Sequence, residues 1–318
     1  MPKWLSRPYS PESNHGTSGE KRLAVKKVSW VEVRGWSLTS PYLVFTLIFF
    51  IIPLVWGIAL LFTHWNLMSP TREFVGLGNF IEAVKSARVH AAFVNTYKIM
   101  GIFIPTVIVA SLSIALLINS IPRFKGVIAV CFFLPYLVSG VASSLVVKGI
   151  LAYNSPLSPL FRALFHDIPD WLGNPFLAII VICLMITWKL SGYYALIFLS
   201  GLSSIPKTLY EAAEIDGAGF WTKLFKITIP MLYPAFYTVL ILAVGLSFGI
   251  FTEPYMLTGG GPQLATHTWY LEIYYQAFSA GRAGYASTVA LINAVVTFFS
   301  IIVVRKVMER WGKAHGWQ

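Results

Sequence analysis

Six long apolar stretches constrain the fold of this chain more than any other feature of its sequence. Each approaches the ~20 residues that a helix needs to cross a hydrocarbon core ~30 Å thick, and they cover residues 40–62, 94–118, 126–150, 175–200, 234–257 and 285–305. They are continuously apolar and do not alternate, which favours helices over the strands of a membrane barrel. Only 12% of the residues are charged, against about a quarter in soluble domains. The sequence therefore predicts an all-α polytopic membrane protein with six transmembrane helices.

The placement of positive charge predicts the orientation in the membrane. The formal net charge is +11 at pH 7, and most Lys and Arg lie in the N-terminal tail, in the connections 119–125 and 201–233, and after residue 304. The other connections hold only Arg72, Lys85, Arg88, Arg162 and Arg282. By the positive-inside rule, we expect both termini in the cytoplasm and the chain in the plasma membrane. Topology and attraction to anionic lipid explain the basic balance, so we expect no nucleic-acid partner.

The chain is expected to divide into a tail, a membrane domain and a second tail. Residues 1–39 are polar and basic and lack the apolar core of a cleaved export sequence. They are expected to form a cytoplasmic tail with an interfacial helix around Val28–Leu38. Residues 40–305 form the predicted transmembrane domain and residues 306–318 a cytoplasmic C-terminal tail. Cys131 and Cys183 lie in apolar runs, which indicates buried packing residues rather than a disulfide or metal site.

The connection 201–233 is unusually long, and long ordered loops tend to carry function. Pro206 can occupy the first turn of a helix that runs through Glu211. Gly217, in the pair Asp216-Gly217, can adopt the positive φ of a turn before a second amphipathic segment. The residues alone leave two interpretations open. The segment is either an amphipathic helix at the membrane surface with solvated charges or a rigid knob that docks into a soluble partner and offers a carboxylate to an Arg.

The same loop resembles the EAA signature of bacterial ABC importer permeases. It reads Glu211-Ala212-Ala213, three residues, Gly217, nine residues, Ile227, one residue, Ile229 and Pro230. The one departure is Ile229, where the family usually has Leu. The longer run from Leu196 to Ala218 resembles the carbohydrate-uptake branch of maltose- and glycerol-phosphate-type permeases.

This resemblance implies a type I ABC importer permease fold in a bacterial inner membrane, coupled mechanically to an ATPase. In this family the EAA helix sits in a cleft of the cytoplasmic ATPase subunit. A coupling role is therefore implied for Glu211, Ala212, Ala213, Asp216, Gly217, Ile227 and Pro230. The implied partners are a second permease (a homologue or a copy), two ATPase subunits and an extracytoplasmic solute-binding protein. ATP and Mg²⁺ are expected on the ATPase subunits, with no cofactor on this chain.

Polar and aromatic residues inside the predicted spans mark a candidate substrate pathway. Sugar sites combine aromatic faces with a few hydrogen-bonding groups, which suggests Trp188, Lys189, Tyr193, Tyr194, Glu253 and Asn293. A Lys at bilayer depth costs about 2.5–3.5 kcal/mol. We therefore expect Lys189 to face a water-filled cavity or to pair with a group on another helix. Glu253 and Asn293 have the alternative of ordinary polar packing.

Two departures from the family pattern bear on the cargo. Tyr153-Asn154 stands where the family usually has Gly-x-x-Asn, and Phe251-Thr252-Glu253 where it often has Phe-Asp. We include Tyr153 and Asn154 in the candidate pathway for this reason. The predicted cargo is a sugar, oligosaccharide or polyol. Uronates, glycerol phosphate esters and another small solute remain alternatives.

Two other function classes fit the sequence less well. An ion-coupled secondary transporter normally needs intramembrane acids or bases and a repeat pattern, but before the boundary residue Arg305 the predicted spans hold only Lys98, Lys148, Lys189 and Glu253. A membrane enzyme needs a catalytic cluster, and the sequence shows no paired carboxylates, nucleophile triad or phosphate loop. We therefore expect a transport subunit that does not itself hydrolyse ATP.

Overall fold

The computed structural model describes residues 30–66, 72–121, 123–165, 168–314 and 316, and most of them are helical. The chain forms two compact units, Met1–Leu54 and Val55–Gln318. In the first unit, α1 (Trp30–Thr46) continues through the π-helical turn η1 (Leu47–Ile51) into α2 (Ile52–Leu60), which ends in the second unit. The predicted interfacial helix around Val28–Leu38 is therefore part of a longer helix, and Val28 itself lies outside the described residues. The apolar side chains of this segment are almost all exposed, so it needs cover from lipid or protein.

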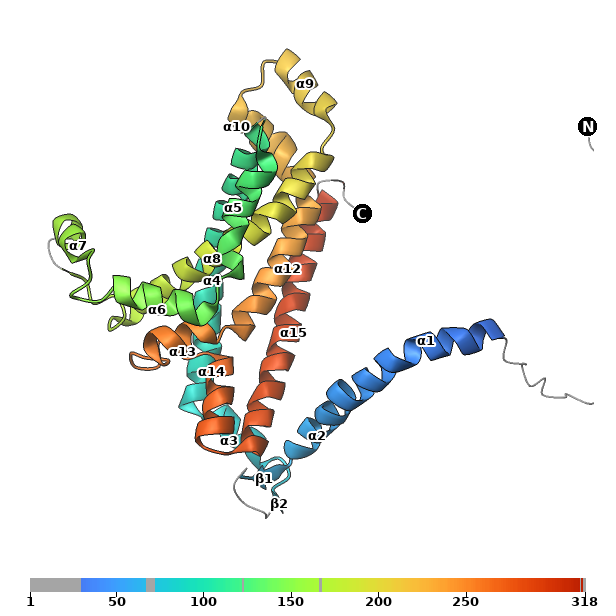
Figure 1. The fold of residues 1–318 in the computed structure, drawn as a ribbon, viewed down its shortest axis with the longest axis vertical. Helices are drawn as coiled ribbons and strands as arrows, with labels where there is room; N and C mark the ends of the chain where they lie inside the picture. The colour runs from blue at the N-terminus through green and yellow to red at the C-terminus, as the bar shows by residue number, and fades with distance from the viewer. Residues whose placement is uncertain (1–29, 67–71, 122, 166–167, 315, 317–318) are drawn as a thin grey trace, which may run out of the picture. The chain divides into compact units, whose positions relative to one another are not determined.

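Four helices of the second unit run side by side and form most of its core (Figure 1): α4 (Ala87–Ser120), α8 (Pro175–Ser204), α12 (Tyr233–Gly249) and α15 (Ala283–Ala314). Local signals start two of them. Ser86 accepts a hydrogen bond from the Val89 N–H at the start of α4. Asn174 accepts from the first N–H groups of α8, with Pro175 at the first helical position. Both are common ways to begin a helix.

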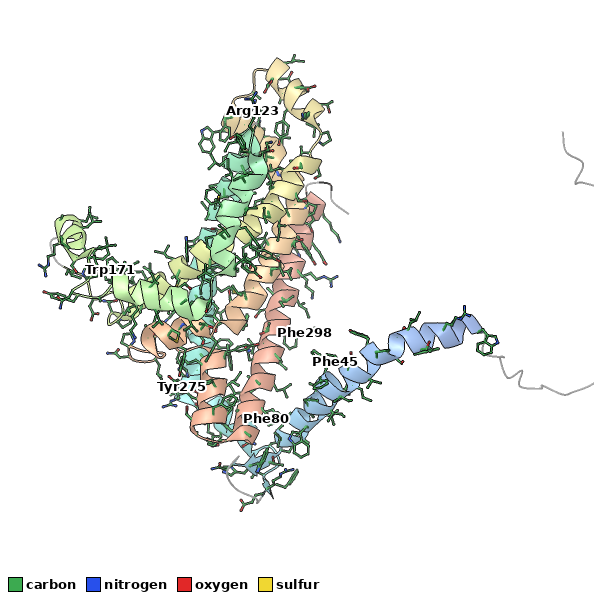
Figure 2. The ribbon with its side chains drawn as sticks, in the orientation of Figure 1. Phe45, Phe80, Arg123, Trp171, Tyr275 and Phe298 are labelled. Carbon is green, nitrogen blue, oxygen red and sulfur yellow. The ribbon has the colours of Figure 1, made fainter. Side chains whose placement is uncertain are left out.

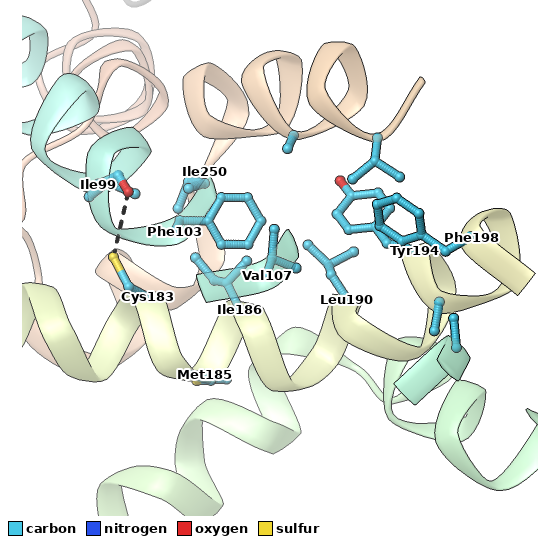
Figure 3. Packing of buried hydrophobic residues seen from close by; sticks show 14 of the residues in the cluster. Ile99, Phe103, Val107, Cys183, Met185, Ile186, Leu190, Tyr194, Phe198 and Ile250 are labelled. Atoms are coloured by element: carbon cyan, nitrogen blue, oxygen red, sulfur yellow. Dashed lines mark hydrogen bonds between the residues drawn. The ribbon is translucent and has the colours of Figure 1, made fainter. Parts of the chain in front are cut away.

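The largest hydrophobic cluster lies between α4 and α8 (Figure 3). Ile99, Phe103 and Val107 of α4 pack against residues of α8, among them Ile186 and Phe198. Cys183 is fully buried here, and its Sγ lies 3.8 Å from the Ile99 carbonyl oxygen, which confirms that part of the cysteine prediction. Cys131 is exposed on α5 (Lys125–Leu137), so the prediction that it is buried is wrong for the isolated chain.

Two of the predicted spans are not continuous helices. The predicted third span bends by 88° between α5 and α6 (Gly140–Ile150). Pro135 lacks the N–H that would complete the last turn of α5, which weakens the helix before the bend. The predicted fifth span, 234–257, is wrong at its end. α12 stops at Gly249, and the short helix α13 (Thr252–Thr258) begins after a break at Ile250 and Phe251.

The number of spans depends on how the bent helices are counted. Among the described residues, four helices are individually long and apolar enough to cross a membrane. Two bent pairs bring the number to six if each pair counts as one span: α5 with α6, and α12 with the segment Phe220–Met231 that precedes it at 68°. The six-span prediction is therefore met only if each bent pair counts as one span.

The two ends of the bundle differ in character. One end carries α9 (Lys207–Ile215) and α10 (Phe220–Lys223), with Arg123 nearby (Figures 1 and 2). The opposite end carries a hairpin and small helices. The strands β1 (Thr63–Trp65) and β2 (Arg72–Phe74) pair antiparallel, with Thr63 opposite Phe74. The helical pieces are α3 (Gly78–Lys85), α14 (Trp269–Tyr274) and the π-helical turn η3 (Tyr275–Ser279).

Buried polar side chains tie the segments of this second end to the bundle. The Asn95 amide of α4 donates to the carbonyls of Leu264 and His267, at 2.6 and 3.1 Å. His267 Nε2 lies 2.7 Å from a Glu272 carboxylate oxygen, and both side chains are almost fully buried. Burial alone would raise the pKa of Glu272, but hydrogen bonds from His267 and Gln276 outweigh it and hold the pKa below its ordinary value. The segment that leads into α14, which contains Leu264 and His267, is therefore held in place by hydrogen bonds to buried side chains of the protein itself.

Candidate functional site

Helix α9 stands out from the end of the bundle (Figure 1). Glu211 and Ala212 are exposed and Ala213 is half-buried. The helix closes with a 2.8 Å hydrogen bond from the Ala218 N–H to the Ala213 carbonyl and a 3.0 Å bond from the Gly217 N–H to Glu214. Gly217 has φ +73°, the left-handed conformation that ends many helices. The predicted helix and turn are thus confirmed, although Pro206 precedes the first turn.

The second half of the loop anchors α9 to the membrane bundle. It consists of α10, the π-helical turn η2 (Leu224–Thr228) and α11 (Ile229–Met231). The Tyr210 hydroxyl of α9 lies 2.9 Å from that of Thr228. Lys223 donates to Glu214 at 2.8 Å, and this hydrogen bond and charge hold the pKa of Glu214 below its ordinary value. The pair is therefore present at neutral pH and is lost as acid protonates Glu214.

The motif residues divide between these two parts of the loop. Glu211, Ala212, Asp216 and Gly217 are exposed on α9 and its turn. Ile227 and Pro230 are half-buried in the anchoring segment. The structure thus presents the acidic part of the motif outward, while the apolar part holds the loop in place.

Large apolar side chains around α9 and α10 have no cover within the chain. Ile215 is 88% exposed, and Trp221 is 67% exposed and stacks on Phe225. Apolar side chains exposed in this way need cover from a protein partner or from the membrane interface. Their exposure is therefore compatible with both interpretations that the residues left open.

The turn after α9 supplies a direct test of this local structure. Gly217→Val places a β-branched residue at φ +73°, which costs about 1–2 kcal/mol or more. We expect cleavage of the loop in limited proteolysis of the purified protein to become about 5–30 times faster, because opening is favoured by that amount. Gly219→Ala is the matched control, since Gly219 has φ −70° and no atom within 4 Å of the added carbon. Equal cleavage rates in the two variants would contradict the assignment.

A polar cavity lies within the bundle, beside the bend between α5 and α6 and the break between α12 and α13. Lys189 of α8 and Glu253 of α13 form an ion pair with a 3.1 Å contact, and their side chains are only 16% and 11% exposed. They line a cavity of about 250 Å³ together with residues from α5, α12 and the α12–α13 break, including Tyr136, Leu246, Phe251 and Thr252. Lys189 thus pairs with a group on another helix, which is one of the two alternatives expected for it, and it also lines a cavity.

A stacked pair of tyrosines separates this cavity from a second hollow. The rings of Tyr136 and Tyr193 lie 4.8 Å apart and are inclined by 13°. Tyr136 lines the cavity with Lys189, whereas Tyr193 lines a hollow of about 680 Å³. The residues of α8 in that hollow continue toward the end that carries α9, as far as Ser204. Two hollows therefore follow one another along α8, with the tyrosine pair between them.

The remaining candidate pathway residues lie elsewhere. Tyr194 is 2% exposed and packs in the core, so the structure removes it from the pathway (Figure 3). Trp188 is half-exposed and lines neither hollow along α8. Tyr153 and Asn154 are exposed in the turn after α6, with the Arg162 guanidinium over the Tyr153 ring. Trp188, Tyr153 and Asn154 therefore do not line the cavity that contains Lys189 and Glu253.

Asn293 lies in a neighbouring cavity of about 690 Å³ between α12, α14 and α15, whose lining is mainly apolar and includes six aromatic residues. The Asn293 side-chain oxygen is buried without a hydrogen-bond partner in the described structure. A buried amide of this kind is suited to accept a hydrogen bond from a ligand or a partner subunit.

Sequence reasoning missed several residues of the polar cavity. No sequence pattern predicts a role for Tyr136, which simply follows Pro135. Thr252 was noted only as part of the departure from the family pattern at Phe251-Thr252-Glu253. Gly140 appears in the sequence only as one small residue among several. In the structure, a Cβ at Gly140 would lie 3.2 Å from Lys189 Nζ and 3.0 Å from a Thr252 methyl group. Among the described residues, no three His, Cys, Asp or Glu side chains are grouped to hold a metal ion.

Comparisons with known proteins agree with this geometry. Residues 75–311 match the family model described as binding-protein-dependent transport system inner membrane component. The chain is 30% identical over 264 residues to the probable ABC transporter permease protein YurN of Bacillus subtilis, covering 81% of this chain and 89% of the relative. It is also 30% identical over 277 residues to the trehalose/maltose transport system permease protein MalF of Thermococcus litoralis, covering 86% and 92%.

The fold is similar to that of solved importers. A chain of the bacterial alginate ABC transporter, crystallised in complex with an alginate pentasaccharide-bound periplasmic protein, superposes with a TM-score of 0.77 at 20% identity. The match covers 89% of this chain and 96% of that chain. The predicted type I permease fold is confirmed by this similarity. With its family model matched over most of its length, the chain belongs to the family of binding-protein-dependent transport system inner membrane components.

Proposed function

We propose that this chain is the permease subunit of an ATP-driven importer that passes a sugar, oligosaccharide or polyol from an extracytoplasmic binding protein into the cytoplasm. The observation that carries the proposal is the exposed α9 helix, which holds Glu211 and Ala212 outward while the rest of the loop anchors it. The carbohydrate cargo is supported by relatives such as the trehalose/maltose permease of T. litoralis.

The loop is placed to couple an ATPase to the cavity. It joins α8, which carries Lys189, to α12, which leads into α13 and Glu253. A force on α9 from a docked ATPase therefore reaches both partners of the ion pair through the two helices that the loop connects. The hydrogen bond between the Tyr210 hydroxyl of α9 and the Thr228 hydroxyl, just before α11, links the two parts of the loop along this path.

The cavity and the hollow along α8 form our proposed route for the cargo. Lys189 and Glu253 provide a donor and an acceptor for hydroxyl groups, and Tyr136, Phe251 and Tyr193 provide aromatic faces. In this proposal the stacked tyrosines separate the outer and inner parts of the route until the helices move. Asn293 lines the neighbouring cavity between α12, α14 and α15, so in this proposal it does not make the first contact with the cargo.

The proposed orientation places both termini and α9 in the cytoplasm of the bacterial inner membrane. Lys207, Lys223 and Lys226 lie in the α9 loop, and the basic end of α15 reaches the same end of the bundle (Figure 1). A second permease and two ATPase subunits complete the proposed complex, and the ATPase subunits bind ATP and Mg²⁺. This chain does not catalyse hydrolysis in the proposal.

The test is ATP hydrolysis by the complex reconstituted in lipid vesicles, with its binding protein loaded with trehalose, maltose, lactose, glycerol or glycerol phosphate. We expect at least one uncharged carbohydrate or polyol to stimulate hydrolysis and to accumulate inside vesicles that present the binding protein at the outer face. If glycerol phosphate is the one compound that stimulates hydrolysis, the cargo is a phosphate ester and not an uncharged carbohydrate or polyol. Transport that continues without any ATPase subunit would refute the importer proposal.

A further inference from the structure

The polar cavity has no net charge of its own. Its lining, all of it described by the structure, includes one cation, Lys189, and one anion, Glu253, and these two side chains form an ion pair with each other. The remaining lining is aliphatic, aromatic or hydroxyl-bearing, including Tyr136 and Thr252. A ligand that enters therefore meets a paired donor and acceptor rather than an unbalanced charge.

We propose that this cavity selects cargo without net charge and that Lys189 and Glu253 determine this specificity. The inference rests on the function proposed above, because it names the charge class of the cargo at the same site. A hydroxyl group both donates and accepts, so it can bridge an ammonium and a carboxylate without separating their charges. A polyhydroxylated neutral molecule fits this arrangement.

An anionic cargo meets an electrostatic barrier in the same cavity. A carboxylate or phosphate that binds Lys189 has to share the ammonium with Glu253, whose side chain is only 11% exposed, or displace that carboxylate. In both cases one cation faces two negative charges in a largely buried site, and burying an uncompensated charge is costly. Uronates and phosphate esters are therefore disfavoured by the charge pair of this chain.

The ammonium group is also held in position by its surroundings. A Cβ at Gly140 would lie 3.2 Å from Lys189 Nζ, so the backbone at the start of α6 passes directly beside the ammonium. Thr252, next to Glu253, packs against the same glycine. This close packing leaves little room for Lys189 to turn from Glu253 toward a ligand, which strengthens the selection.

One experiment measures cargo preference directly on the purified complex without the binding protein. The probes are the stimulating sugar and its uronic acid, in which a primary hydroxyl is oxidised to a carboxylate, and saturation-transfer NMR detects their weak binding. We expect the wild type to prefer the neutral probe. Glu253→Gln, which leaves Lys189 as an unpaired cation, should raise the ratio of acid to neutral binding about tenfold. Lys189→Met should lower the same ratio.

The opposite directions of the two variants keep the inference testable if one of them fails to assemble. A wild type that binds the acid as well as the neutral probe overturns it, and so does a ratio that neither variant changes. Failure of the proposed function looks different, because then no sugar stimulates ATP hydrolysis at all.

A second experiment measures the electrostatic potential of the cavity in the absence of any sugar. Thr252→Cys is made together with Cys131→Ser, because Cys131 is exposed whereas Cys183 is buried. Anionic and cationic methanethiosulfonates then modify the new thiol, and mass spectrometry of this chain gives the two rates. We expect Glu253→Gln to raise the anionic-to-cationic rate ratio about tenfold and Lys189→Met to lower it. Unchanged ratios would show that the pair does not set the potential of the cavity.

Discussion

Replacing Glu211 by Ala is expected to abolish the stimulation of ATP hydrolysis by loaded binding protein while the permease still folds in the membrane. Glu211 is exposed on α9, and the described part of the chain provides it with no ion-pair partner. A carboxylate in this position is available to a basic residue of a docked ATPase. Removing one partner of a buried charge pair costs about 2–5 kcal/mol, so we expect the affinity for the ATPase subunit to fall about 30-fold or more.

The neighbouring acid on the same helix supplies the control. Glu214 already pairs with Lys223 within the loop, and exposed pairs of this kind contribute little. Glu214→Ala should therefore retain most of the stimulation. Copurification of the ATPase subunit and its hydrolysis rate measure both variants. If Glu214→Ala is as damaging as Glu211→Ala, the effect comes from the loss of acidic charge on α9 in general and not from a specific contact of Glu211.

The sequence predicted the features that depend on local composition or on a continuous motif. The apolar runs predicted the long helices, because a hydrocarbon core requires about 20 consecutive apolar residues. The loop at 201–233 was predicted as helix, turn and helix because Asp216-Gly217 marks the turn locally. The bends did not follow from the same information. A largely apolar run such as 126–150 contains Pro135 but no signal for the direction in which its second half leaves Val138.

The cavity was only partly predictable, because it depends on contacts between distant segments. Lys189 and Glu253 were each recognised as unusual within a span, but 64 positions separate them, and nothing in either span predicts that they meet. Tyr193 and Tyr194 show the same limit at closer range. Successive residues of a helix point in directions about 100° apart, so one tyrosine lines a hollow and the next packs in the core.

Gly192→Ala is expected to destabilise the bundle more than Gly101→Ala or Gly219→Ala, although each adds a single methyl group. A Cβ at Gly192 of α8 would overlap the backbone carbonyl oxygen of Phe132 on α5. A backbone atom cannot turn aside as a side chain can, so α5 and α8 have to separate. Overpacking of this kind costs about 1–3 kcal/mol, and the melting temperature of the purified protein should fall by several degrees.

The same substitution should also impair the cavity, because the close approach at Gly192 fixes the position of the tyrosine pair. Phe132 lies one helical turn before Tyr136, and Gly192 directly precedes Tyr193. Gly101→Ala is the matched control, since it adds a methyl group in the middle of α4 with no atom within 4 Å. Thermal unfolding and sugar-stimulated hydrolysis are measured on both variants. Small residues allow membrane helices to approach closely, so a Gly192→Ala protein as stable and active as Gly101→Ala would mean that α5 and α8 do not need this contact to position Tyr136 against Tyr193.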